Sequence, residues 1–350
     1  MKALRLISPG NLKLLNNVKV PKVSDNSILL KVNYCGICSS DIKFIDKSHR
    51  IKKYPITLGH EISGTIEKIG KKVNNFKIND KIILGAEIPC GICHYCKTKR
   101  SDFCTNQKSV GTLLNGGFSE YLLLDSHFIN FGPISKINKN DSLKYASLSE
   151  SVACVFNGIE NTKQNTFNSI LILGCGYMGI VFAYVLSKKF KNKKILMVDN
   201  NFERIKYISK LKIASVYKKD FKDKNFITEI LKKNDSNKFD FVISSNNLLI
   251  SHELSMELVS KGGFVNLFGG IPRENDDILH ISANKIHYDQ IHLSGSFSSN
   301  KSQLQQAFKF INKNKSFFKN LITEVLDLDQ ALKYFNLVRE NKVIKAIVKI

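Results

Sequence analysis

The first residues that could do chemistry are four cysteines packed into one fifteen-residue stretch, CGICHYCKTKRSDFC. The spacing is C-x2-C-x2-C-x7-C, and it is formed by Cys90, Cys93, Cys96 and Cys104. Four thiolates this close in sequence can surround one tetrahedral ion and leave no coordination position for a substrate. The pattern therefore predicts a structural zinc. Disulfides in an exported protein and an iron–sulfur cluster are the alternatives.

A second candidate metal site combines residues from two neighbouring turns. Cys38 lies in CGICSSD, residues 35–41, and the segment GHE, residues 59–61, supplies His60 and Glu61. Cysteine, histidine and carboxylate are suitable zinc ligands, and three of them leave one position open for a reacting molecule. A single histidine is more often a structural residue than a ligand. The spacing alone therefore leaves both interpretations open.

A glycine-rich loop, GCGYMG at residues 174–179, follows an apolar segment and precedes a helix-like one. In such a loop the first glycine makes a tight turn, the second lets a pyrophosphate approach, and the third permits close helix–strand packing. The helix N-terminus then faces the phosphates. A turn without a ligand is the alternative, but the order of strand, loop and helix favours a dinucleotide site. The expected contact residues are Gly174, Gly176, Tyr177, Met178 and Gly179.

The choice between the two nicotinamide dinucleotides depends on the end of the next strand. Asp199 stands where a carboxylate can accept hydrogen bonds from a ribose diol, and the same charge would repel a 2′-phosphate. This position favours NAD over NADP. Arg204 is close in sequence and could accept the additional phosphate, so it is also a candidate cofactor residue.

Two kinds of segment must position these residues. The first 150 residues show short strands separated by Gly, Asn and Asp turns, which is typical of an irregular β domain. From residue 169 onward, apolar strands alternate with amphipathic helices, for example at 177–190 and 202–211. This alternation predicts an α/β domain with a doubly wound parallel sheet. Its strands are expected at 169–174, 194–199, 214–217, 239–243, 263–269 and 291–296. Helices are expected at 301–312 and 327–340, and the closing segment VIKAIVKI is expected to return to the first domain as an edge-like strand.

Composition limits the remaining possibilities. The net charge is +23, but the lysines are spread through the chain, which indicates a general bias and not a nucleic-acid-binding patch. The sequence lacks a signal-peptide pattern and any apolar run long enough to span a membrane. Eight cysteines without an export signal indicate a reducing compartment, so we expect a cytoplasmic protein. Cys154 and Cys175 are expected to be packing residues.

Taken together, these motifs resemble the zinc-dependent medium-chain alcohol dehydrogenases, and more narrowly their polyol branch with the sorbitol and threonine dehydrogenases. The resemblance covers nearly the full chain. The matching segments, in family order, are CGICSSD, TLGHEISGTIEKIG, NDKIILGAEIPCGICHYC, GGFSEYLLL, LSESVACVFNG, GCGYMG and GGFVNLFGG.

The resemblance implies a GroES-like irregular β catalytic domain and a Rossmann NAD-binding domain. The catalytic domain would span residues 1–150, carry the structural zinc lobe at about 88–106, and be completed by 297–350. The Rossmann domain would span residues 151–296. Two zinc ions per chain are implied, one structural and one catalytic.

The resemblance also implies roles for single residues. Cys38, His60 and Glu61 would ligate the catalytic zinc, and Glu150 would be a fourth ligand or hold the zinc-bound water. Ser40 would pass a proton out from the substrate alcohol, and Asp41 would orient a ligand. The chain departs from the family at three positions: Lys43 replaces the outer histidine of the proton relay, Ser151 replaces a proline, and Ser39 replaces a glycine or arginine near the cofactor phosphates.

The expected activity is hydride transfer between NAD and a secondary alcohol. The alcohol would be a polyol, a cyclitol or a sugar-derived alcohol, with phosphorylated forms included. The alternatives are an NADPH-dependent reductase of a sugar-derived ketone, a non-catalytic NAD-binding relative, and a zinc-ribbon protein that binds nucleic acid. The expected partner is a small-molecule alcohol, with no nucleic acid and no membrane. Family resemblance implies a homodimer or homotetramer.

Overall fold

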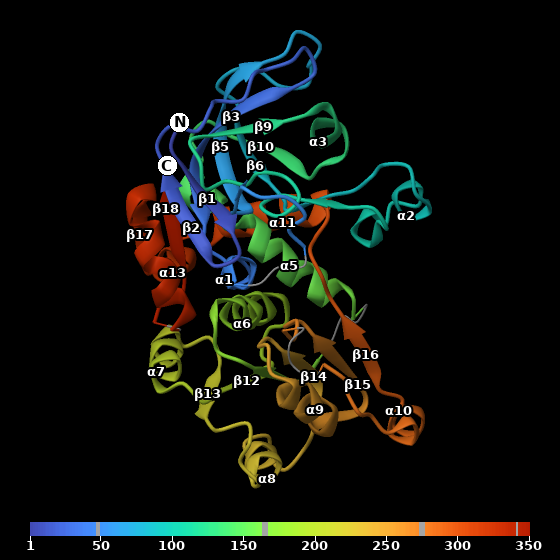
Figure 1. Ribbon diagram of the computed structural model, residues 1–350. Helices are drawn as coiled ribbons and strands as arrows, with labels where there is room; N and C mark the ends of the chain where they lie inside the picture. The colour runs from blue at the N-terminus through green and yellow to red at the C-terminus, as the bar shows by residue number, and fades with distance from the viewer. Residues whose placement is uncertain (47–49, 163–166, 273–276, 341) are drawn as a thin grey trace. The chain divides into compact units, whose positions relative to one another are not determined.

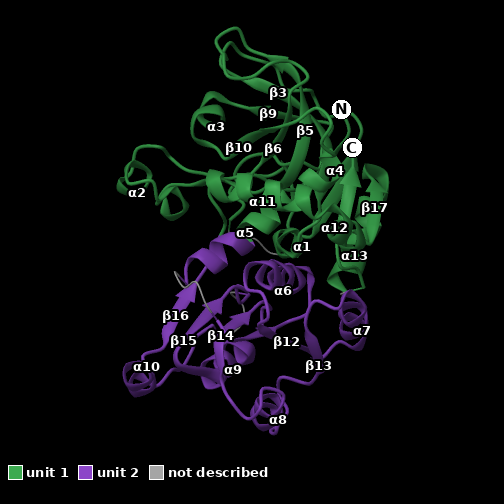
Figure 2. Cartoon of the chain, turned by 180° about the vertical axis from the view of Figure 1, so that it is seen from behind, with its two compact units in different colours: residues 1–154, 298–350 green, residues 155–297 purple. Residues whose placement is uncertain are grey.

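The computed structural model describes residues 1–46, 50–162, 167–272, 277–340 and 342–350. The chain forms two compact units, which Figure 2 colours separately. Unit 1 comprises residues 1–154 and 298–350, and unit 2 comprises residues 155–297. The chain passes from one unit to the other within a single helix, α5 (Ser149–Glu160).

Unit 1 is built on antiparallel β structure, in which the largest sheet has the order β10-β6-β5-β3-β18-β17, with β9 also paired to β3. A second sheet has the order β2-β1-β4, of which Figure 1 labels β1 and β2, and β7 pairs with β8. The strands are β1 (Ala3–Ser8), β2 (Asn11–Leu15), β3 (Ile28–Gly36), β4 (Ile56–Thr57), β5 (Glu61–Ile69), β6 (Lys81–Leu84), β7 (Glu87–Ile88), β8 (Lys108–Ser109), β9 (Tyr121–Leu124), β10 (Ile134–Ile137), β17 (Glu324–Asp327) and β18 (Ala346–Lys349).

The helices of unit 1 are short apart from α5 and α11, and they connect or cover the strands. They are α1 (Ser39–Asp46), α2 (His94–Lys97), α3 (Ser126–Phe131), α4 (Leu143–Ala146), α5, α11 (Lys301–Lys313), α12 (Lys315–Leu321) and α13 (Ala331–Arg339). The helix expected at 327–340 begins later than predicted, because the first part of that segment forms the end of β17 and a 3-10 turn (Leu328–Gln330).

The closing strand β18 returns to unit 1 as the sequence predicts, but it is not an edge strand. It lies between β3 and β17 in the large sheet. Its residues Ala346, Ile347 and Val348 are buried. Consecutive residues of a strand point to opposite faces of the sheet, so the burial of all three means that both faces are covered here, which explains the continuous apolar run AIV.

Unit 2 is a parallel sheet with the strand order β13-β12-β11-β14-β15-β16 (Figure 1). This is the doubly wound order, with the first strand of the unit, β11, in the middle of the sheet. The predicted parallel α/β fold is therefore confirmed. The strands are β11 (Ser169–Leu173), β12 (Lys194–Asp199), β13 (Ser215–Lys218), β14 (Phe239–Ser244), β15 (Val259–Leu267) and β16 (His292–Gly295).

The central strands of unit 2 are apolar on both faces. In β11 the residues Ile170, Leu171, Ile172 and Leu173 are all fully buried, as expected for a parallel strand covered on both sides. The helices of this unit are α6 (Tyr177–Lys189), α7 (Phe202–Leu211), α8 (Phe226–Lys232), α9 (Leu249–Leu258) and α10 (Ala283–Asp289). Within the described residues, no helix combines the length and the apolar character that a membrane crossing needs.

Candidate metal centres and cofactor-binding loop

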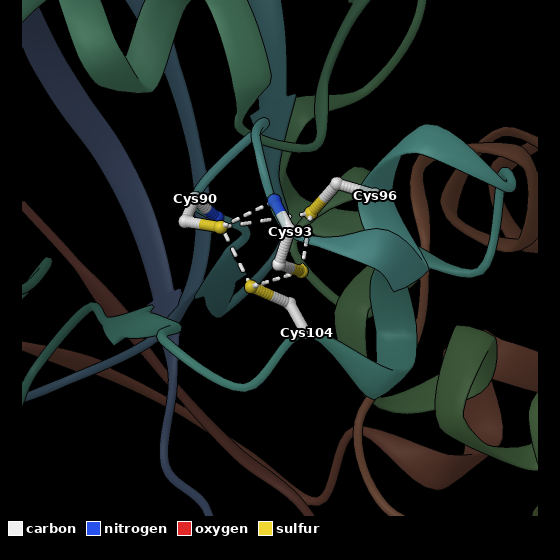
Figure 3. Close-up of side chains that lie close together, drawn as sticks. All are labelled: Cys90, Cys93, Cys96 and Cys104. Carbon is white, nitrogen blue, oxygen red and sulfur yellow. Dashed lines mark hydrogen bonds between the residues drawn. The ribbon is translucent and has the colours of Figure 1, made fainter.

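The four cysteines of the 90–104 segment form a compact group (Figure 3). Their sulfur atoms all lie within 4.8 Å of one another, and individual Sγ–Sγ distances are 3.5 Å for Cys93–Cys96, 3.8 Å for Cys93–Cys104 and 4.0 Å for Cys90–Cys96. Zinc–sulfur bonds of about 2.3 Å in a tetrahedron place the sulfurs ~3.8 Å apart. The donor set and its spacing therefore fit a structural zinc.

Backbone amides of the lobe already favour thiolates. The amide of Cys90 donates to Cys104 Sγ at 3.1 Å, and the amide of Cys93 donates to Cys90 Sγ at 3.4 Å. The backbone N–H of Cys96 lowers the pKa of Cys93 to about 6, whereas desolvation raises the pKa of Cys96 to about 12. Backbone hydrogen bonds also lower the pKa of Cys90, and desolvation raises the pKa of Cys104. Two thiols of the group thus ionise more easily than usual, and a cation is needed to hold the other two as thiolates.

The second candidate site lies where β3 and β5 meet. Antiparallel pairing sets Gly36 at the end of β3 opposite Glu61 at the start of β5. Cys38 follows two residues after this pair, and His60 precedes β5 directly. The Cys38 thiol, a His60 ring nitrogen and a Glu61 carboxylate oxygen lie within 4.8 Å of one another. Sheet register thus brings together three residues that sequence spacing leaves apart, and their donor chemistry fits a zinc site with an open position.

Two residues of α1 surround the His60 ring. Ser40 Oγ is 3.4 Å from His60 Nε2, and Asp41 Oδ1 is 3.4 Å from His60 Nδ1. Asp41 Oδ2 also accepts a 2.9 Å hydrogen bond from the backbone N–H of Cys38. Burial by itself would lower the pKa of His60, but the Asp41 carboxylate and contacts with Cys38 raise it overall. The ring therefore has a fixed orientation, with Nε2 facing the Cys38 side.

Glu150 lies in the first turn of α5, and its side chain is buried. Its carboxylate is outside the 4.8 Å group formed by Cys38, His60 and Glu61. Desolvation raises the pKa of Glu150 to about 7, opposed by the charge of His60. Cys154, one helical turn along, lies with its Sγ 3.6 Å from Glu150 Oε1. Cys154 is thus a polar neighbour of this site in addition to a packing residue.

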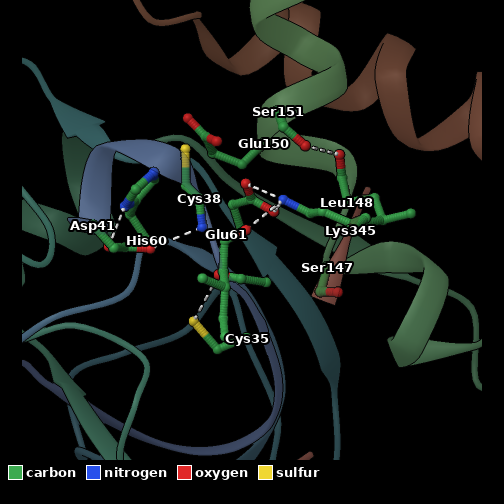
Figure 4. A network of polar contacts seen from close by, with 12 residues as sticks. Cys35, Cys38, Asp41, His60, Glu61, Ser147, Leu148, Glu150, Ser151 and Lys345 are labelled. Atoms are coloured by element: carbon green, nitrogen blue, oxygen red, sulfur yellow. Dashed lines mark hydrogen bonds and ion pairs between the residues drawn. The ribbon is translucent and has the colours of Figure 1, made fainter. Parts of the chain in front are cut away.

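Sequence reasoning did not find Lys345, which lies next to this group (Figure 4). Its ammonium nitrogen is 2.5 Å from Oε1 and 2.5 Å from Oε2 of Glu61. Lys345 is 3 % exposed and Glu61 is 0 % exposed, so the ion pair is fully buried. The signal in the sequence is a lysine within the apolar closing segment VIKAIVKI, but nothing local indicates its partner 284 positions away.

The glycine loop of unit 2 has the geometry that its spacing predicts. Gly174 follows β11 with φ of +110°, a conformation that favours glycine. A Cβ on Gly179 would lie 2.0 Å from the Gly174 carbonyl oxygen, so this glycine allows close packing of α6 on the loop. Gly176 is the N-cap of α6, and Tyr177 and Met178 form its first turn. The backbone amides at the start of this helix suit an anionic ligand.

The carboxylate of Asp199 lies under this loop at the end of β12. It accepts hydrogen bonds from the backbone N–H groups of Cys175 at 2.7 Å and Asn201 at 2.9 Å. Arg204 Nη1 is 3.8 Å from Asp199 Oδ2. The structure thus brings together Asp199, the candidate for the ribose diol, and Arg204, the candidate for an additional phosphate, beside the glycine loop.

Comparison with protein families identifies the domains that carry these sites. Residues 24–133 match the alcohol dehydrogenase GroES-like domain, and residues 181–313 match the zinc-binding dehydrogenase domain. The chain belongs to the zinc-dependent medium-chain alcohol dehydrogenases. The family predicted from the motifs is therefore confirmed, and with it an oxidoreductase of the zinc-dependent, NAD(P)-linked type and the GroES-like character of unit 1.

Individual relatives of this dehydrogenase match over almost its whole length. It is 26 % identical to D-arabinitol dehydrogenase 1 of Uromyces fabae, covering 100 % of this chain and 97 % of the relative. It is also 26 % identical to D-arabitol-phosphate dehydrogenase of Enterococcus avium, and this match covers 95 % of this chain and 92 % of the relative. The fold is similar to that of an alcohol dehydrogenase from Thermus sp. ATN1, with a TM-score of 0.88 at 19 % sequence identity. The match covers 100 % of this chain and 99 % of that one.

The three departures from the family motifs have clear positions in this dehydrogenase. Ser39 is the first residue of α1, and Lys43 lies one turn further along the same helix. Burial lowers the pKa of Lys43, while the neighbouring Cys38 opposes this shift. Ser151 Oγ donates a 3.0 Å hydrogen bond to the carbonyl of Leu148, which holds the start of α5 at the position where the family resemblance implies a proline.

Proposed function

We propose that this dehydrogenase transfers a hydride between NAD and a secondary alcohol at the site formed by Cys38, His60 and Glu61. The observation that carries the proposal is the convergence of a thiol, an imidazole and a carboxylate within 4.8 Å. Three such donors leave a coordination position for an alcohol oxygen, in contrast to the four cysteines of the lobe.

We assign a role to each residue around this site. Cys38, His60 and Glu61 hold the catalytic zinc, and Glu150 is a fourth ligand or holds the water bound there. When bound, zinc supplies a Lewis acid that eases loss of the hydroxyl proton. Ser40, whose Oγ is 3.4 Å from His60 Nε2, accepts that proton and passes it outward. Asp41 holds His60 in the required orientation from the opposite ring nitrogen.

For the cofactor we propose NAD in preference to NADP, bound by the glycine loop and Asp199. Asp199 is buried at the end of β12, and a carboxylate there would repel the 2′-phosphate of NADP. Each carboxylate oxygen can accept more than one hydrogen bond, so the bonds from Cys175 and Asn201 leave acceptor capacity for ribose hydroxyls. Arg204, whose Nη1 lies 3.8 Å from Asp199 Oδ2, favours the alternative, an NADPH-dependent reductase of a sugar-derived ketone, because an arginine at this place could pair with a 2′-phosphate.

The proposed substrate is a polyol, a cyclitol or a sugar-derived alcohol, with phosphorylated forms included. This class is supported by the names of the relatives, which act on D-arabinitol and D-arabitol phosphate. The net charge of +23 would favour collection of an anionic substrate.

We also propose a homodimer or homotetramer in a reducing, cytoplasmic compartment. Within the described part of unit 2, β16 is an edge strand, and Tyr288 and Leu293 beside and on it are exposed. Edge strands with apolar neighbours are common places for a second chain to pair. None of the eight cysteines, all of which the structure describes, forms a disulfide, which suits a reducing environment.

The test is NADH formation by the zinc-loaded protein on polyols, cyclitols, threonine and their phosphates, with NADP run in parallel. Turnover of one class with NAD supports the proposal and fixes the substrate. A preference for NADP would contradict the role of Asp199. Absence of turnover in the wild type, restored by Lys43→His, would place the fault in the proton relay. Absence of turnover in both proteins, with two zinc ions bound, would contradict the proposed substrate class.

A further inference from the structure

The Glu61 carboxylate is enclosed by one residue of β3 and one residue that directly precedes β18. Gly36 on β3 lies directly opposite, and a Cβ there would be 2.1 Å from Glu61 Oε2. Lys345, just before β18, approaches the same carboxylate with its ammonium 2.5 Å from both oxygens. The glycine therefore provides the space and the lysine provides the charge that holds this side chain.

A second hydrogen bond holds the Lys345 side chain in this position. Its Nζ also donates a 3.1 Å hydrogen bond to the carbonyl of Ile37, one residue before Cys38. Lys345 is buried, and its charge lowers the pKa of the nearby Glu150 as well. A buried ammonium that lost its carboxylate partner would be strongly destabilised. Lys345 therefore stays paired with Glu61 unless another interaction compensates for the loss of this ion pair.

We propose that Lys345 is a positioning residue that competes with the catalytic zinc for the Glu61 carboxylate. The inference rests on the proposed function, because it takes Cys38, His60 and Glu61 as the zinc site. A carboxylate already paired with an ammonium on both oxygens is a weaker zinc ligand than a free one. Lys345 thereby weakens the zinc site.

The experiment compares zinc affinity and thermal stability in wild type, Lys345→Met, Lys345→Arg and a control, Lys349→Met. Lys349 is exposed on the adjoining strand and tests the loss of a lysine alone. Zinc binding is measured by competition with a chromophoric chelator, and melting is recorded with and without Zn²⁺. The cysteine lobe is unchanged in all variants, so its zinc is an internal reference.

Without zinc, Lys345→Met leaves Glu61 buried and unpaired, so we expect its melting temperature to fall on the order of 10 °C. With zinc, the unpaired carboxylate becomes a better ligand, so we expect the second zinc to bind at least about tenfold more tightly. Lys345→Arg keeps the charge, so its zinc affinity and melting temperature should stay close to those of the wild type. The same is expected of Lys349→Met. A merely structural lysine would lower stability equally with and without zinc, and this result would overturn the proposal.

Two further variants keep the test decisive. If Lys345→Met does not fold without zinc, Lys345→Gln retains a hydrogen-bond donor for Glu61 and repeats the comparison. Combining Lys345→Met with Glu61→Gln removes both charges, so it should recover metal-free stability and lose the tighter zinc binding. Failure of that recovery would also overturn the proposal. A wild-type protein that binds only one zinc per chain would instead overturn the proposed function, while the metal-free comparison would still report on the ion pair.

Discussion

Two glycines of one loop should respond differently to the same substitution, because one faces protein and the other faces the expected cofactor. A Cβ on Gly176 meets no protein atom closer than 3.9 Å, at Arg204 Nη1. A Cβ on Gly179 would lie 2.0 Å from the carbonyl oxygen of Gly174. Gly176→Ala should therefore affect cofactor binding, and Gly179→Ala should affect folding.

The expected changes in NAD affinity and in stability follow from these distances. Gly176→Ala should leave the melting temperature unchanged. If its methyl group displaces one charge-assisted hydrogen bond to the pyrophosphate, the cost is ~1.5–3 kcal/mol, which weakens NAD binding roughly 10- to 150-fold. In Gly179→Ala, better helix propensity contributes about 1 kcal/mol. Against this, two backbone segments must separate by about 1 Å, and such overpacking costs up to ~3 kcal/mol.

The net loss for Gly179→Ala is ~2 kcal/mol, which corresponds to a melting temperature lower by roughly 4–8 °C. Thermal unfolding by circular dichroism and NAD titration by calorimetry measure the two effects separately. Gly295→Ala is the matched control, since a Cβ there meets nothing within 4 Å. Wild-type NAD affinity in Gly176→Ala, or wild-type stability in Gly179→Ala, would refute the reasoning.

Three further predictions concern the metal sites. Cys93→Ala should lower the bound zinc by one ion per chain and destabilise the protein by several kcal/mol, because metal binding contributes to folding; unchanged zinc content by atomic absorption would contradict the lobe assignment. Cys38→Ala and His60→Ala should each abolish turnover and leave the circular dichroism spectrum unchanged, and retained turnover in either would exclude the proposed catalytic zinc. In the metal-free protein, the pKa of Glu150 is raised from 4.5 to about 7, so the folded state binds this proton more tightly than the unfolded state. Stability should fall by up to ~3 kcal/mol as the pH rises through this window; urea unfolding at pH 5 and pH 8 should show this slope in wild type and lose it in Glu150→Gln.

Local patterns in the sequence were enough to predict the cysteine lobe, the strands of unit 2 and the glycine loop. The cysteines of the 90–104 lobe are close in the chain, so short loops alone can bring their sulfurs together. The strands of unit 2 were predicted within a few residues, except β15, which begins at Val259 and not at 263. Their fully buried runs and the glycine loop are signals carried within single segments.

The remaining features depend on pairings between distant segments. Lys345 and Glu61 meet because β18 enters the sheet beside β3, and no local pattern specifies which interior strand receives a closing segment. The need for glycine at position 36 arises from the same register, since the Glu61 carboxylate lies against it. Short-range sequence thus determined the chemical groups and their elements, whereas sheet register, set by packing of the whole unit, decided which charges are buried together.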